Sequence, residues 1–128
     1  EGHVAVRIKA HVQIAYGEEL LVCGSAPQLG SWNLAEAALM TCEDKVWSLA
    51  TFLPCGVRVE LKLVQRPQGR AVIWHGAGAG GSANVQLETS LGRGGAQRSR
   101  FAGLEGFPWL LEVEDLGPEE AAGLLAKP

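Results

Sequence analysis

Several features that define other classes of protein are missing from this chain of 128 residues. No apolar run approaches the length that spans a bilayer, so we expect no membrane partner. The formal net charge of −3 at pH 7 argues against nucleic acid as the main partner. The three cysteines, Cys23, Cys42 and Cys55, have neither an even count nor the paired spacing of a disulfide framework or a zinc site. We therefore expect reduced thiols and no metal.

The chain begins with Glu1-Gly2 rather than Met and shows no signal-peptide pattern. We expect it to be part of a longer protein. Reduced thiols indicate an intracellular compartment. The Ala-, Gly- and Leu-rich composition favours, as a hypothesis, the plastid stroma.

No catalytic pattern is visible in the sequence. The three histidines are dispersed, and the serines lack a nucleophile elbow. Residues 76–81 match G-x-G-x-x-G after an expected strand, but a β pattern follows them instead of a helix. A dinucleotide would then have no helix N-terminus for its pyrophosphate. We expect a protein that is not an enzyme and needs no cofactor.

Alternation of apolar and polar residues is the clearest pattern in the chain. In residues 4–14 every second residue is apolar, which is typical of a strand with one buried face. Shorter patterns bounded by Gly and Pro predict further strands at residues 20–23, 46–53, 57–63, 71–74, 84–88 and 107–114. The apolar, Ala-rich residues 34–40 are compatible with a short helical turn that leads into a strand, and the pattern leaves their assignment open. The acidic first turn after Pro118 predicts a short C-terminal helix.

These elements predict an all-β fold, a two-sheet antiparallel β-sandwich (immunoglobulin-like) of seven or eight strands with a short C-terminal helix. We expect the sandwich to occupy residues 1–114 and to contain a long Gly- and Arg-rich loop at residues 89–106. Residues 115–128 form an acidic C-terminal extension.

Tryptophan is unusually frequent, with four residues against one Tyr and three Phe. Trp32 lies in a Gly-, Ser- and Pro-rich turn, where an exposed indole would suit a sugar ring, although taken alone it favours packing at the open end of the sandwich. Trp74 ends a strand before a glycine-rich loop and is expected at the rim. Trp47 has apolar neighbours and is predicted to be a core residue. Trp109 is expected to pack or to contact a partner.

Two charged residues are expected on the outer face of one strand. Lys62 points away from the side of Leu61 and Leu63, and Glu60 shares its face. Such residues are usually solvated surface. Placed beside two indoles, however, they would complete a site for a hydroxyl-rich ligand.

The order of several short motifs across residues 3–88 resembles the starch-binding domains of carbohydrate-binding module family 20. These motifs are Tyr16-Gly17-Glu18, Gly24-Ser25, Leu29-Gly30-x-Trp32, Trp47, Leu53-Pro54, Glu60-x-Lys62, Trp74 and Asn84. The resemblance implies a β-sandwich that binds α-1,4-glucans without catalysis, commonly at two sites. In the first site, tryptophans matching Trp32 and Trp74 stack on consecutive glucose rings. Residues matching Lys62 and Glu60 bind sugar hydroxyls, and the asparagine of this site would match Asn84.

The resemblance also implies a second site around Tyr16. The usual aromatic companion is missing from residues 41–45, so a weak or absent second site is expected. The tryptophan matching Trp47 is largely structural in the family.

The function expected is noncatalytic binding of α-glucan (starch, amylose, glycogen, maltooligosaccharides or cyclodextrin), which would target a larger parent protein to starch. One alternative is a β-sandwich that has lost sugar binding and contacts another protein. A second is an enzyme that binds a nucleotide at its glycine-rich loop.

Overall fold

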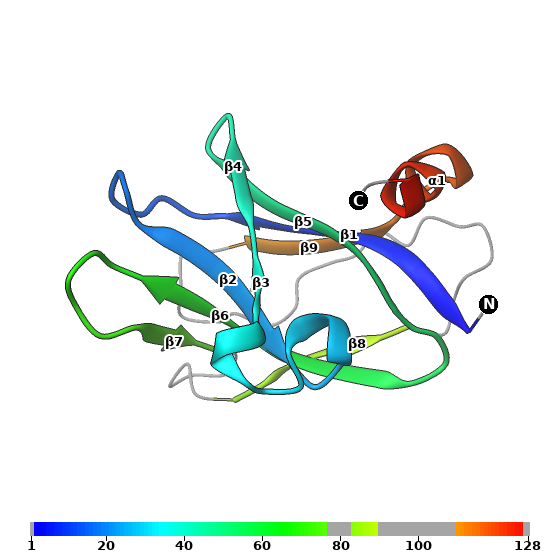
Figure 1. Cartoon of the computed structure of the whole chain (residues 1–128), viewed down its shortest axis with the longest axis horizontal. Coiled ribbons are helices and arrows are strands. Elements are labelled where there is room, and N and C mark those ends of the chain that lie inside the picture. Colours follow the sequence, from blue (N-terminus) through cyan, green and yellow to red (C-terminus); the bar gives the residue numbers. More distant parts are fainter. Residues whose placement is uncertain (1, 77–82, 90–109, 127–128) are drawn as a thin grey trace.

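The computed structural model describes residues 2–76, 83–89 and 110–126. The predicted loop at residues 89–106, apart from Thr89, and Trp109 lie outside this part of the chain. Within it, nine strands form two antiparallel sheets that face each other, with one short helix at the C-terminal end (Figure 1). The predicted β-sandwich is therefore confirmed.

The first sheet is built around the strand with the clearest alternation. Ile8 pairs with Leu49 on one side and with Val113 on the other, and all three point into the sandwich. Arg7 and Lys9 lie between the buried positions and are partly exposed. The strands in order across this sheet are β4 (Thr41–Glu43), β5 (Val46–Pro54), β1 (His3–His11) and β9 (Leu110–Asp115).

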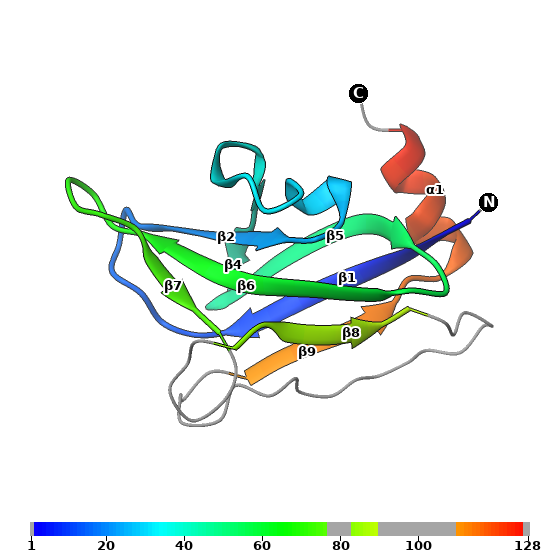
Figure 2. The same ribbon diagram turned by 90° about the horizontal axis from the view of Figure 1, so that it is seen from below.

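The second sheet is organised by one long strand, β6 (Arg58–Arg66). One edge of β6 pairs with β2, and its other edge pairs with β7 and β8 one after the other (Figure 2). The remaining strands of this sheet are β2 (Glu19–Gly24), β3 (Ala38–Leu39), β7 (Ile73–His75) and β8 (Val85–Glu88). Strands β3 and β4, of two and three residues, lie where the sequence has no clear alternation.

The main apolar core fills the space between the sheets, as the alternation requires. It includes the completely buried side chains of Ile8, Leu20, Leu29, Met40, Leu53, Leu61, Leu63 and Leu111. A second and smaller cluster, formed by Leu21, Cys23 and Val64, lies on the outer face of the second sheet.

Residues 24–37 pack on both sides of the second sheet. Ala26 and Leu29, the latter in the 3-10 turn η1 (Pro27–Leu29), belong to the main core, whereas Leu34 and Ala37 pack against the smaller cluster. Residues 34–40 combine the 3-10 turn η2 (Leu34–Glu36) with the short strand β3. Their apolar side chains are divided between the outer face and the core, so they show no single strand or helix period.

The C-terminal end of the described chain joins the first sheet at its edge. β9 pairs with β1, and the predicted helix is present as α1 (Pro118–Ala126). Arg7 Nη1 lies 3.2 Å from Glu120 Oε2, and Lys9 Nζ lies 3.6 Å from Glu114 Oε2. Opposite charges on β1 and on the β9–α1 segment thus support the docking of this segment. None of the helices in the described ranges has the length and apolarity needed to cross a bilayer.

Candidate functional site

The loop that carries Trp32 is tied to the backbone of β6. Ser25 N donates to Glu60 O at 2.8 Å, and Glu60 N donates to Ser25 Oγ at 2.9 Å. Trp32 N donates to Gly24 O at 2.8 Å. A Cβ atom on Gly24 would clash with Glu60 O, so glycine permits this close approach. These contacts fix the start of the loop, and with it Trp32, beside Glu60.

Trp32 itself lies in a strained stretch of backbone at the surface. Its φ is +66° and that of Ser31 is +50°, both in the left-handed region that favours glycine. The residue is 39% exposed, and its side chain belongs to neither of the two apolar clusters of the described residues. This geometry favours an indole offered to a ligand over an indole used for packing.

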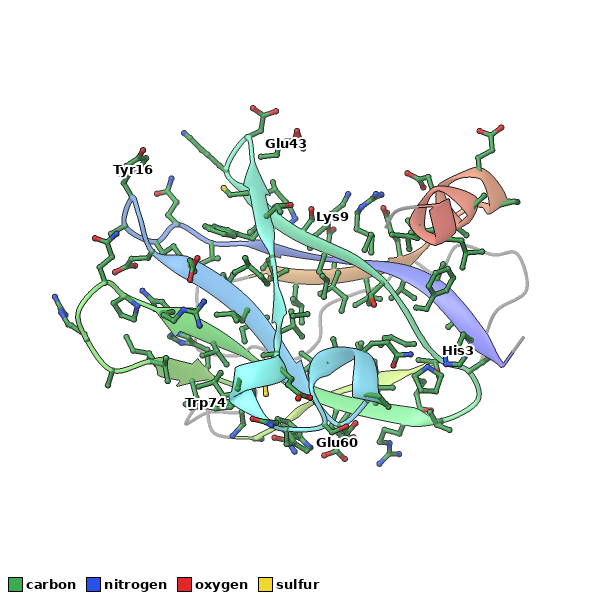
Figure 3. All side chains as sticks on the ribbon, in the orientation of Figure 1. His3, Lys9, Tyr16, Glu43, Glu60 and Trp74 are labelled. Carbon is green, nitrogen blue, oxygen red and sulfur yellow. The ribbon has the colours of Figure 1, made fainter. Side chains whose placement is uncertain are left out.

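Strand β6 and its neighbour β7 bring three other predicted residues to the same outer face. Leu61 and Leu63 are buried in the main core, so Glu60 and Lys62 point outward, as predicted. Trp74 pairs with Val64, which belongs to the outer cluster, so the indole shares this face and is 40% exposed. Figure 3 shows Trp74 and Glu60 along the second sheet.

The polar groups of this face are only partly paired. Asn84 Nδ2 donates to Glu60 Oε1 at 2.7 Å. Among the described residues, the ammonium of Lys62 has no ion pair or hydrogen bond. A carboxylate acceptor and an unpaired ammonium donor can therefore form hydrogen bonds with the hydroxyl groups of a ligand whose ring stacks on the indoles. We call this set the tryptophan face: Trp32, Glu60, Lys62, Trp74 and Asn84.

A groove of about 590 Å³ lies elsewhere in the structure, around Tyr16. Its lining combines residues 12–18 with Cys42, Lys45 and Trp47. Tyr16 is fully exposed at the tip of the turn between β1 and β2, away from Trp74 and Glu60 (Figure 3). We call this the Tyr16 groove.

Trp47 is the residue of the Tyr16 groove that the sequence argument missed. The prediction of a core residue is right in part, because Trp47 packs against the main core. It is also only half-buried and lines the groove. It pairs with Ala10 on β1, a partner with a small side chain. An aromatic residue is therefore available beside Tyr16 although residues 41–45 contain none.

Two titratable side chains of the second sheet have shifted pKa values. Burial raises the pKa of the Cys23 thiol and lowers the pKa of His75. Cys23 is thereby kept as an unreactive thiol in the outer cluster. The structure, over the residues it describes, shows no group of three or more His, Cys, Asp or Glu side chains suited to a metal ion.

Comparison with known proteins agrees with the fold. The family model "Starch binding domain" matches residues 3–92. An α-amylase of Thermomonospora curvata is 39% identical over 79 residues, which make up 59% of this chain and 13% of the amylase. An AA13 family lytic polysaccharide monooxygenase A of Aspergillus terreus is 29% identical over 76 residues, 56% of this chain and 19% of that protein.

The structure of a glycoside hydrolase family 15 glucoamylase from Hypocrea jecorina is similar in fold. It has a TM-score of 0.61 at 23% identity, over 70% of this chain and 15% of the glucoamylase. The described sandwich and the match over residues 3–92 define a carbohydrate-binding module. The chain belongs to the starch-binding domains of the CBM_20 family, which are noncatalytic α-glucan-binding domains. The matches span 13% and 19% of the two sequence relatives, so the chain corresponds to a small part of each.

Proposed function

We propose that this domain binds α-1,4-glucan on the tryptophan face by stacking glucose rings on Trp32 and Trp74. The observation that carries the proposal is that two indoles, each about two fifths exposed, are held by segments tied to β6, the strand that presents Glu60 and Lys62 outward. A glucose ring has apolar C–H faces and a polar rim. Indole faces and flanking charged groups match both parts of such a ring.

Asn84 has a supporting role in this proposal. Its amide nitrogen already donates to Glu60 Oε1, so it directs one carboxylate oxygen and leaves the other for the sugar. Its own Oδ1 can accept a hydrogen bond from a sugar hydroxyl. We propose that Glu60 and Lys62 make the primary hydrogen bonds and that Asn84 orients Glu60.

The expected affinity for a single chain end is modest. Stacking on one indole buries a limited apolar area, worth about 1–2 kcal/mol per ring at roughly 25 cal/mol per Å². The platform is built on paired strands and a tied loop, which limits the cost of ordering it. Many chain ends on one starch granule then raise the overall affinity.

We propose the Tyr16 groove as a second and weaker glucan site, with Tyr16 and Trp47 as its aromatic residues. Both line the same groove. Only part of the Trp47 ring is accessible, so less apolar surface is offered here than on the tryptophan face.

The domain would direct a larger protein to starch. Its matches to an α-amylase and to a polysaccharide monooxygenase cover a minor part of each relative, as expected for a module joined to different catalytic domains.

The test is depletion of the purified domain from solution by granular starch. We expect Trp32→Ala and Trp74→Ala to lose most of the binding while the circular dichroism spectrum stays native. Leu125→Ala is the matched control, because Leu125 is an exposed apolar side chain on α1. Equal binding by all four proteins would contradict the tryptophan face. No starch binding by the folded wild-type domain would favour the protein-interaction alternative.

A further inference from the structure

The turn that carries Tyr16 has a defined geometry. Glu18 N donates to Ala15 O at 3.0 Å, which closes a four-residue turn with Tyr16 and Gly17 at its centre. Gly17 has φ +89°, as a type II turn requires at this position. The side chain of Tyr16 is fully exposed. Its place beside the groove is therefore set by the turn and not by packing of the ring.

A chain of side-chain hydrogen bonds supports this turn from the second sheet. Glu18 Oε1 accepts from Ala15 N at 3.0 Å and from Gln65 Nε2 at 2.9 Å. Gln65 Oε1 in turn lies 3.0 Å from His75 Nε2. Because the Gln65 amide nitrogen donates to a carboxylate, its oxygen faces the ring, and His75 Nε2–H is the donor.

Gln65 thus bonds to Glu18, which lines the Tyr16 groove, and to His75, which follows Trp74, but it belongs to neither candidate site. It lies on β6 opposite Ile73, is half-buried, and is outside the lining of the Tyr16 groove. His75, its other partner, directly follows Trp74 on β7. Burial lowers the pKa of His75, which keeps the ring neutral and its Nε2–H directed at Gln65 near pH 7.

We propose that Gln65 is a positioning residue for the Tyr16 groove, acting on the ligand only through Glu18 and the Tyr16 turn. This inference rests on the proposed second glucan site. Loss of the Gln65–Glu18 bond would free the Glu18 carboxylate and loosen the turn. Tyr16 would then spend less time beside Trp47.

The experiment isolates the groove by using Trp32→Ala as the background and maltoheptaose as the probe, followed by NMR titration. Gln65→Met keeps the length of the side chain and removes both hydrogen bonds. We expect it to weaken binding roughly three- to tenfold, which is less than the full worth of one hydrogen bond to a charged acceptor because Gln65 acts on the ligand only through the turn. Gln86→Met, on an exposed position of β8, is the matched control and should bind as the background does.

Two further variants separate positioning from general stability. Glu18→Gln retains an oxygen that can accept both bonds, so it should bind within about twofold of the background, whereas Glu18→Ala should resemble Gln65→Met. In a Tyr16→Ala background, where the tryptophan face is intact, Gln65→Met should leave the affinity unchanged. Equal weakening in both backgrounds, or no weakening in the Trp32→Ala background, would overturn the inference.

Hydrogen exchange of the Ala15 amide makes the two possible failures distinguishable. Gln65→Met should speed this exchange even without sugar, because Ala15 N donates to the carboxylate that Gln65 holds. Faster exchange with no maltoheptaose binding in the Trp32→Ala background would refute the second glucan site and retain only the support of the turn. Unchanged exchange would refute the role of Gln65 itself.

Discussion

Replacement of Trp32 by Ala and by Gly separates the ligand-binding role of the indole from its structural cost. The side chain is 39% exposed, so its removal forfeits the burial of the remaining area, about 100–150 Å². At roughly 25 cal/mol per Å² this is about 3 kcal/mol of stability for Trp32→Ala. The backbone at φ +66° costs a non-glycine residue about 1 kcal/mol. Trp32→Gly should therefore be about 1 kcal/mol more stable than Trp32→Ala.

Urea unfolding followed by circular dichroism measures these free energies of unfolding, and starch depletion measures the binding of each variant. Both variants should have lost most of their binding. Ser31→Gly is the control for backbone strain: Ser31 is exposed at φ +50°, so this variant should gain about 1 kcal/mol and keep its affinity. A Trp32→Gly protein less stable than Trp32→Ala would refute the strain argument. Normal starch binding by either variant would refute the role of the indole.

Three other predictions concern single side chains. Trp74→Ala should weaken maltoheptaose binding about five- to thirtyfold, the equivalent of one lost ring stack, and calorimetry will show whether it does. Thr89→Val should cost about 1–3 kcal/mol of unfolding free energy in urea, because buried Thr89 Oγ1 lies 2.6 Å from Pro54 O and accepts from Val57 N. Burial lowers the pKa of His75 below its ordinary value of 6.5, so the unfolded chain takes up the proton first and stability should fall as pH drops below that value. His75→Gln should remove this part of the pH dependence, and an unchanged slope would contradict it.

The sandwich could be predicted from local patterns because its core strands alternate strictly. Val6, Ile8 and Ala10 are buried in the structure, as the period of two requires. The outward direction of Lys62 follows from the same rule and is also confirmed. Strands β3 and β4 were not predictable in this way, since each is at most three residues long and depends on a neighbouring strand.

The candidate sites could not be predicted from local sequence patterns, because each is formed by segments far apart in the chain. The sequence alone favoured packing for Trp32, and only the family resemblance placed it in a binding site. After Trp32, the chain packs Leu34 and Ala37 against the smaller apolar cluster on the outer face, and this contact joins residues far apart in the sequence. The groove beside Trp47 is likewise formed by separate segments, residues 12–18 after β1 and the β4–β5 hairpin. No period within β5 could reveal it.

The central claim is that indoles of the tryptophan face contact the bound glucan. The most direct measurement is a titration of the domain with maltoheptaose followed by tryptophan fluorescence, with the Trp32→Ala/Trp74→Ala double variant in parallel. Stacking of glucose on the indoles predicts a saturable change of fluorescence in the wild-type protein and loss of most of its amplitude in the folded double variant. A flat titration of the wild-type domain, or an equal change in both proteins, would contradict it.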